Sequence, residues 1–306
     1  MVNISFYIKN FRWLYIVFIL TFCSAFGQTF FISLYSEEIR HSFKLSHGQW
    51  GLIYSTATLS SAILILFVGG YADKLSARMM SSIVICGLMA FVFGMAINSS
   101  FIFLIFIILG LRFFGQGMLG HLSMVYCGKW FSKNRGKAVA VANSGYTLAE
   151  ASLPTIFVIL IGIFVWERTW FISFIICVII FLSILIFLTV ERDKKDRGNG
   201  KITQTGMNNK SWTRNEMIKS WVFWLALPAL LVQPIFSTTF FFQQVYYTEI
   251  KQWPLELFVA LIPIYTVASI IGLMVGSLII DKYRTSMLLP VYLLPMAIGF
   301  VIASYA

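Results

Sequence analysis

Residues 101–127 read FIFLIFIILGLRFFGQGMLGHLSMVYC, a run of 27 residues that contains one charged side chain, Arg112. A helix needs about 20 mostly apolar residues to cross a membrane, so this run is long enough to span one. The rest of the chain is similar: 59% of its residues are hydrophobic, 11% are charged, and the mean hydropathy is +0.83. Soluble domains carry about 25% charged residues. The sequence therefore predicts an all-α membrane protein.

Nine membrane spans are expected along the chain, joined by short loops that contain charged residues, Gly or Pro. They lie at about 12–34, 48–71, 79–97, 101–127, 138–162, 168–190, 220–246, 255–280 and 286–305. A polar stretch rich in charged residues, Gly and Asn separates the sixth span from the seventh. The expected organisation is an N-terminal six-helix bundle over 1–190, a cytoplasmic linker over 191–219 and a partial C-terminal bundle of three helices over 220–306.

The distribution of basic residues predicts the orientation. If the N-terminus is cytoplasmic, 18 of the 23 Lys and Arg residues fall in inside segments, and four fall in outside loops: Arg40, Lys44, Arg168 and Lys251. The positive-inside rule then favours a cytoplasmic N-terminus. The net charge of +11 follows from this topology and forms no continuous basic face, so no nucleic-acid partner is expected. We expect a multi-pass protein of the plasma (inner) membrane, a monomer in contact with lipid.

The Cys and His residues show no pattern of catalysis or metal binding. The four Cys lie inside or at the edge of apolar stretches, and the three His are scattered, with no nucleophile, base or metal ligand at suitable spacing. The sequence therefore predicts neither enzyme activity nor a cofactor nor a metal site.

Two similar motifs occur at equivalent places in the two halves. Residues 69–74 (GGYADK) close the second span on the inside, and residues 277–282 (SLIIDK) close the eighth. Both read small residue, three apolar or small residues, Asp and Lys. Parallel repeats of six helices are one known way to build a transporter, with the substrate bound near the bilayer midplane.

With these features the chain resembles the major facilitator superfamily, whose best-known signature follows the second span. The matching residues and their second copy form the expected gating motif: Gly69, Asp73, Lys74, Arg78, Asp281 and Lys282. Ser76 stands where the family prefers Gly. The resemblance implies that Asp73 and Arg78 cap helix ends and pair across the inner face, a charge lock that holds the outward-open state; an ordinary solvated turn is the alternative.

The resemblance also implies the fold. It is a helical bundle of the superfamily type, here with a complete six-helix N-terminal half and about three helices of the C-terminal half. Because the family pattern has twelve helices, we expect the sequence to be a C-terminally incomplete part of a longer protein.

Arg112 is the most informative single residue, because it lies near the midplane of the fourth span. A guanidinium there costs at least about 2.5–3.5 kcal/mol on insertion scales, so it should face a polar cavity or a partner. The surrounding residues look like the family's second signature, and helical spacing puts Gln116 on the face of Arg112. Three uses stay open: binding the carboxylate of an anionic substrate, a conformational or proton-coupling role, and a structural pair with Glu150 of the fifth span. Glu150 is itself a candidate proton carrier.

Further polar residues inside the spans are candidates for the substrate path. They are Gln28 in the first span, Tyr54 in the second, Gln233, Gln243 and Gln244 in the seventh, and Tyr265 in the eighth. In the superfamily the first, fourth, seventh and tenth helices line the path, which favours Gln28 and Gln233. Hydrogen bonds between helices are the alternative for each Gln.

The resemblance implies a secondary active transporter, a symporter or antiporter, that works by alternating access. Arg112 with its Gln, Tyr and Trp neighbours favours a small organic anion as substrate, similar to the monocarboxylate and oxalate/formate branch of the superfamily. A coupled proton and an exchanged counter-anion are both open. The alternatives are a sugar or drug transporter of the same fold, or a non-transporting membrane sensor.

Overall fold

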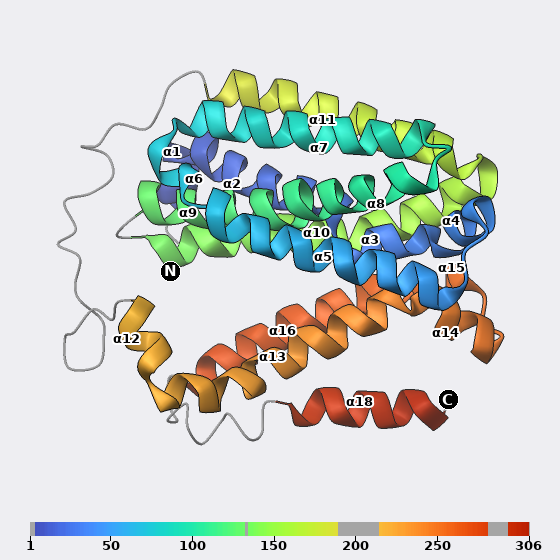
Figure 1. The fold of residues 1–306 in the computed structure, drawn as a ribbon. Helices are drawn as coiled ribbons and strands as arrows, with labels where there is room; N and C mark the ends of the chain where they lie inside the picture. Colours follow the sequence, from blue (N-terminus) through green and yellow to red (C-terminus); the bar gives the residue numbers. More distant parts are fainter. Residues whose placement is uncertain (1–3, 132–133, 189–213, 281–292, 306) are drawn as a thin grey trace. The chain divides into compact units, whose positions relative to one another are not determined.

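A computed structural model describes residues 4–131, 134–188, 214–280 and 293–305. Throughout these ranges the regular secondary structure is helical, as the sequence predicts (Figure 1). Seven of the described helices are long and apolar enough to cross a membrane, and an eighth span is added if a helix pair bent by 44° within residues 11–43 is counted as one. Only α18 (Leu294–Tyr305), an apolar helix of 12 residues, represents the ninth expected span; residues 281–292 are outside the described ranges.

The helices of residues 4–187 follow one another with short connections. They are α1 (Ile4–Lys9), α2 (Phe11–Ser24), η1 (Ala25–Gly27), α3 (Thr29–Ile32), η2 (Ser33–Tyr35), α4 (Ser36–Phe43), α5 (His47–Val68), α6 (Tyr71–Lys74), α7 (Ala77–Ile97), α8 (Phe101–Gly110), η3 (Leu111–Leu119), α9 (Gly120–Trp130), α10 (Arg135–Ile163) and α11 (Trp166–Phe187). Later helices are α12 (Arg214–Lys219), α13 (Trp221–Phe242), α14 (Gln244–Lys251), α15 (Leu255–Ala260) and α16 (Ile262–Ile280).

The chain forms two compact units. The first comprises residues 1–200 with 244–263, and the second comprises residues 201–243 with 264–306. The short helices α14 and α15 thus belong to the same unit as the six expected N-terminal spans. Most of the expected linker falls outside the described ranges, and the division at 190 and 219 stays a prediction.

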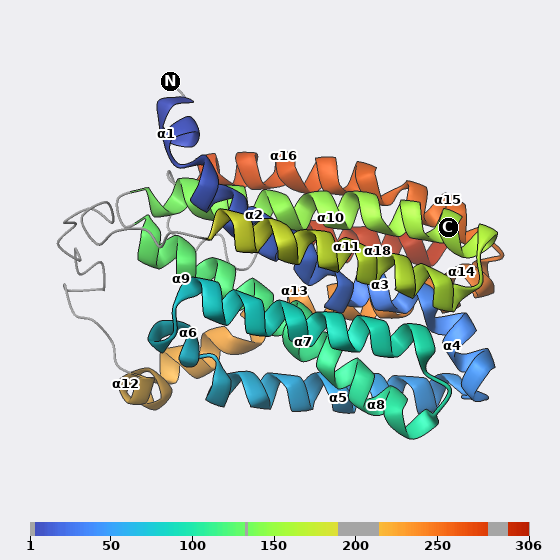
Figure 2. The ribbon, with the colours of Figure 1, turned by 90° about the horizontal axis from the view of Figure 1, so that it is seen from above.

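Close helix packing holds the first unit together. α2 packs against α10 and α9, α7 packs against α11, and α5 packs against α8 and η3. Figure 2 shows α2 beside α10 and α7 beside α11. Gly145 of α10 lies directly on α2, because a Cβ atom there would collide with the carbonyl oxygen of Phe18 and come within 2.6 Å of Thr21 Oγ1. The Thr21 hydroxyl donates to the Ala142 carbonyl of α10. Small residues at crossings, with hydrogen bonds between helices, are typical of packing in membranes.

Serine side chains fix where two of the spans begin. Ser46 and Gln49 form a capping box at the start of α5, with each side chain bonded to the backbone of the other residue. Ser76 accepts from the backbone N–H of Met79 at 3.2 Å and caps α7. This gives a local role to Ser76, which stands where the family prefers Gly.

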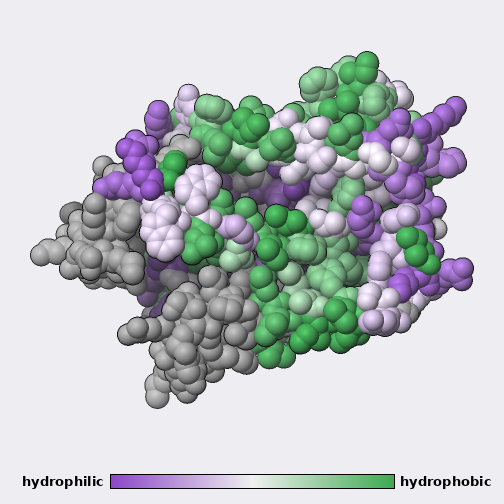
Figure 3. Space-filling view, turned by 60° about the horizontal axis from the view of Figure 1, so that its bottom comes forward, coloured by the Kyte–Doolittle hydropathy of each residue, from purple (hydrophilic) through white to green (hydrophobic). Residues whose placement is uncertain are grey.

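The surface shows the pattern of a membrane protein. In Figure 3, hydrophobic side chains (green) occupy the middle of the face shown, and hydrophilic ones (purple) gather at its right-hand end and at the upper left. Leu66 and Phe67 of α5, Ile102 of α8 and Ile186 of α11 are among the large apolar side chains that are exposed. Lipid provides the apolar surroundings that such side chains need.

Candidate functional site

The first membrane span is broken at Gln28. Helix α2 continues as η1 to Gly27, Gln28 is extended with φ −82° and ψ 154°, and α3 starts at Thr29. The backbone N–H groups of Phe31 and Ile32 both bond to the Gln28 carbonyl, at 3.2 and 3.1 Å. Among the described residues no backbone N–H bonds to the carbonyl of Gly27. In the membrane interior such an oxygen needs another donor.

Arg112 supplies that donor. Its Nη1 donates to Gly27 O at 3.0 Å and to Thr29 Oγ1 at 3.1 Å. Its Nε donates to Thr58 Oγ1 of α5 at 3.1 Å, so the guanidinium joins the first, second and fourth spans. Only 2% of the Arg112 side chain is exposed, and its Cζ atom lies 5.2 Å from the centre of the Tyr54 ring.

An irregularity of the fourth span brings Arg112 to this place. Residues 111–119 form η3, a π-helical segment, and such segments occur frequently at functional sites. The backbones of the first and fourth spans touch here: a Cβ atom on Gly115 would lie 2.6 Å from the Cα of Gly27. The side chain of Arg112, three residues before Gly115, therefore starts beside the broken segment.

The acidic residue of the fifth span does not pair with Arg112. Glu150 is 8% exposed, and its Oε1 accepts from the Tyr146 hydroxyl at 3.2 Å. No ion pair links Glu150 to Arg112 in the described structure, so the structural-pair alternative is wrong for this conformation. The partners of Arg112 are neutral oxygen atoms and an aromatic ring, and the charge is buried without a counter-ion from the described part of the chain.

The other predicted substrate residues fall into two groups. Tyr54 lies in the site, where its hydroxyl donates to Thr29 Oγ1 at 2.9 Å, and Gln28 forms the break itself. Gln116 is half-buried on η3. In the second unit, Gln233 is exposed on α13 and Tyr265 lies edge-on to Phe241. The assignment of all these residues to a substrate path stays a prediction.

Two residues that bond to Arg112 were not found by the sequence analysis, and the structure gives the environment of one candidate, Gln244. Thr29 and Thr58 bind Arg112, but an isolated Thr in an apolar span gives no signal of its own. Gln244 is fully buried, and its Nε2 donates to Phe30 O at 3.1 Å and Ser33 Oγ at 2.8 Å. Its Oε1 is buried with no hydrogen-bond partner.

No group of three or more metal-binding side chains occurs in the ranges searched.

The gating motif after the second span, which we call the inner motif, forms an ion pair with the fourth span. Asp73 Oδ1 lies 3.1 Å from Nζ of Lys129, which also donates to Ala72 O at 2.7 Å. Arg78 is exposed on the first turn of α7 and has no ion pair in the described structure; the charge lock across the inner face stays a prediction. His121 Nε2 donates to Gly69 O at 3.1 Å. Residues Asp281 and Lys282, the second copy of the motif, lie outside the described ranges.

Lys129→Gln should lower the free energy of unfolding by less than about 1 kcal/mol, because exposed ion pairs contribute little. Both partners are partly exposed, with 30% of the Lys129 side chain and 70% of the Asp73 side chain accessible. Thermal unfolding in detergent measures the change, with Lys74→Gln as the matched control on the same loop. A loss of several kcal/mol would show that the pair is part of the core.

Comparisons with known proteins give the family and the fold. The sequence matches the family model described as Major Facilitator Superfamily over residues 17–306, and no curated protein matches it. Two similar solved structures are of a bacterial homologue of the human lysosomal transporter Spinster, inward-facing and either unoccupied or occupied. They share 18% sequence identity with this chain, with TM-scores of 0.64 and 0.63 over 89% and 92% of its length. The chain spans 63% of the length of each.

Proposed function

Because the chain belongs to the Major Facilitator Superfamily, we propose that it acts in secondary active transport of a small organic anion, such as a monocarboxylate, by alternating access. One observation carries the substrate class: Arg112 is buried and charged, and no acidic residue in the described ranges neutralises it. An anionic substrate supplies the missing negative charge.

The hydrogen bonds of the guanidinium leave one of its nitrogen atoms available to such a ligand. Nε and Nη1 are already bonded to Thr58, Gly27 and Thr29, whereas Nη2 has no hydrogen bond among the described residues. A carboxylate oxygen that accepts from Nη2 makes a charge-assisted bond, roughly twice as strong as a neutral one. The Tyr54 ring centre lies 5.2 Å from Arg112 Cζ, and Gln28 lies in the chain between Gly27 and Thr29, so these two residues are the proposed neighbours of the substrate.

Binding at Arg112 also suggests how the substrate is coupled to movement. The same guanidinium holds the carbonyl oxygen freed by the break in the first span. A substrate that draws Arg112 away from Gly27 loosens the link between the two pieces of that span. Interactions that differ between two conformations are what allows a ligand to shift their populations.

The proposed coupling ion is a proton carried by Glu150. This carboxylate is buried and accepts a hydrogen bond from the Tyr146 hydroxyl. An exchanged counter-anion is the competing source of energy. The proposal places the protein in the plasma or inner membrane, as a monomer with a cytoplasmic N-terminus.

Uptake into proteoliposomes tests this function. Labelled lactate, oxalate and a hexose are offered separately, with and without an inward proton gradient, and protein-free liposomes are the control. We expect accumulation of lactate or oxalate, increased by the gradient, and no accumulation of the hexose. Accumulation of the hexose alone would refute the carboxylate proposal, and anion uptake that ignores the gradient would favour exchange over proton coupling.

A further inference from the structure

A fully buried amide of α14 has one atom without a partner. Gln244 is the first residue of this helix, and its side chain has no exposed surface. Its Nε2 donates to Phe30 O at 3.1 Å and to Ser33 Oγ at 2.8 Å, whereas its Oε1 has no hydrogen-bond partner among the described residues. Buried polar atoms are nearly always hydrogen-bonded in folded proteins. The unpaired Oε1 therefore requires a donor from outside the described chain.

The surroundings of Gln244 fix which end of its amide is unpaired. The carbonyl oxygen of Phe30 can only accept a hydrogen bond, so the amide nitrogen, and not the amide oxygen, must face it. Ser33 Oγ donates its own proton to Thr29 O at 2.7 Å, so it also accepts from Gln244. Turning the amide over would place Oε1 against two acceptors. Oε1 is therefore held as a free acceptor, and the group that it binds must carry an O–H or an N–H.

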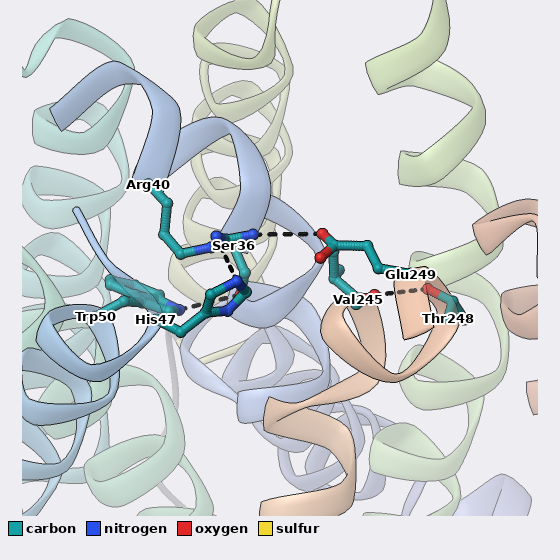
Figure 4. A network of polar contacts seen from close by, with 7 residues as sticks. All are labelled: Ser36, Arg40, His47, Trp50, Val245, Thr248 and Glu249. Carbon is teal, nitrogen blue, oxygen red and sulfur yellow. Dashed lines mark hydrogen bonds and ion pairs between the residues drawn. The ribbon is translucent and has the colours of Figure 1, made fainter. Parts of the chain in front are cut away.

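Helix α14 is anchored to the first unit, which fixes the position of Gln244. Val245 and Thr248 of α14 are buried, and the Thr248 hydroxyl donates to Val245 O at 2.8 Å within the helix. Farther along the same helix, Glu249 Oε1 lies 3.3 Å from Arg40 Nη2 of α4 (Figure 4). These contacts hold the start of α14 beside the broken first span.

Gln244 and Arg112 bond to the same face of the first span. Thr29 and Ser33 are four residues apart in consecutive helical segments, so their side chains lie on one face, with about 5–6 Å between their Cβ atoms. Arg112 Nη1 donates to Thr29 Oγ1 at 3.1 Å, and Gln244 Nε2 donates to Ser33 Oγ at 2.8 Å. A positively charged donor and a neutral acceptor are thus bonded to this face about one helical turn apart.

On the basis of the anion transport proposed for Arg112, we propose that Gln244 Oε1 accepts a hydrogen bond from a hydroxyl group of the same anion, so that the substrate is a short hydroxy acid. Arg112 can only donate and Oε1 can only accept, so the two ends of the ligand must differ. A carboxylate accepts from Nη2 of Arg112, and a hydroxyl donates to Oε1. When these groups are on neighbouring carbon atoms and each makes a hydrogen bond of about 2.8 Å, they reach across a helical turn of about 5.4 Å.

The single neutral acceptor favours a hydroxyl over other groups at this position. An ammonium group brings a second positive charge close to Arg112, and the amide oxygen of Gln244 cannot offset that charge in a buried place. A keto group has no proton to donate, so its oxygen would face Oε1 as one acceptor against another. The site should therefore select a hydroxy acid over the amino acid, the keto acid and the unsubstituted acid of the same size.

Binding of four small acids to the full chain in lipid nanodiscs tests the proposal. Isothermal titration calorimetry measures the dissociation constants of lactate, propionate, pyruvate and alanine, which share a carbon skeleton and differ at the second carbon. We expect lactate to bind at least about tenfold more tightly than the other acids, because a ligand without the hydroxyl leaves the buried acceptor unpaired. Equal binding of lactate and propionate would overturn the proposal and leave the carboxylate transport standing. Alanine or pyruvate that binds as tightly as lactate would overturn it as well.

Two variants of α14 assign the effect to Gln244. Gln244→Leu removes the acceptor and keeps a side chain of similar size, so we expect it to bind lactate and propionate equally. Thr248→Val is the matched control, because it replaces another buried polar side chain of α14, whose hydroxyl bonds within the helix. It should keep the wild-type ratio of the two dissociation constants. A wild-type ratio in Gln244→Leu would show that another group recognises the hydroxyl and would overturn the proposal.

The wild-type series separates this proposal from the proposed transport. It needs no substitution, so it decides the role of the hydroxyl even where Gln244→Leu does not fold. If the wild type binds none of the four acids, the anion transport proposed for Arg112 is refuted together with the hydroxyl site. If it binds all four equally, only the hydroxyl site is refuted.

Discussion

Arg112→Gln should weaken binding of the transported anion by about 100-fold or more, and Arg112→Lys by about tenfold. The loss of one partner from a buried charge-assisted pair costs about 2–5 kcal/mol. Lys keeps the positive charge, but the three N–H donors of its ammonium group would all be used by Thr58, Gly27 and Thr29, which leaves none for the anion. Gln keeps neither the charge nor the fork.

Binding and transport are measured separately, using the anion that accumulates in the uptake assay. Arg78→Gln is the matched control, because it removes a positive charge from an exposed site with no ion pair in the described structure. It should leave binding unchanged. If both Arg112 variants bind and transport the anion like the wild type, the substrate and coupling roles of Arg112 are excluded together. Retained binding with lost transport would assign Arg112 to the conformational cycle.

The sequence was sufficient to find Arg112 but not its partners. One charge in 27 residues of apolar sequence marks a side chain that must be buried, because lipid makes an exposed one costly. Of the three uses that the sequence leaves open for Arg112, the structural pair names Glu150 as the partner. The structure instead uses Thr29, Thr58 and the Gly27 carbonyl, and that carbonyl is available only because the first span breaks. No Pro marks this break in the sequence.

The inner motif shows a similar limit. The signature implies that Asp73 and Arg78 pair across the inner face, but it does not name their partners. Lys129 follows Asp73 by more than fifty residues and reaches it because α6 packs on α9. Apolar periodicity locates helices and their lipid-facing surfaces, but it does not say which helix ends meet. Likewise α14 begins at the end of the seventh expected span, yet it packs with the N-terminal spans.

Gly27→Ala and Gly115→Ala should each lower the free energy of unfolding by about 3 kcal/mol, at the upper end for overpacking a close contact. A Cβ atom on Gly27 would collide with the Leu111 carbonyl oxygen and lie 2.7 Å from Gly115 Cα and 2.8 Å from Gln116 N. All three are backbone atoms, so no side chain can rotate to make room. The two spans must move apart, or the protein must unfold.

Gly120→Ala is the matched control in the same span, since a Cβ atom there has nothing within 4 Å. It should be neutral or stabilising by up to about 1 kcal/mol, because Ala is the better helix former. Unfolding in detergent, followed by circular dichroism, measures all three variants. Stability of Gly115→Ala equal to that of Gly120→Ala would show that the two backbones do not touch.

The same substitutions test whether this crossing positions Arg112. A separation of the first and fourth spans lengthens the bond from Nη1 to Gly27 O, now 3.0 Å, and leaves the carbonyl of the break without its donor. Any Gly27→Ala or Gly115→Ala protein that remains folded should therefore bind the anion more weakly than Gly120→Ala. Equal anion binding by the folded variants would mean that the guanidinium is positioned by Thr58 and Tyr54 alone, without the contact between Gly27 and Gly115.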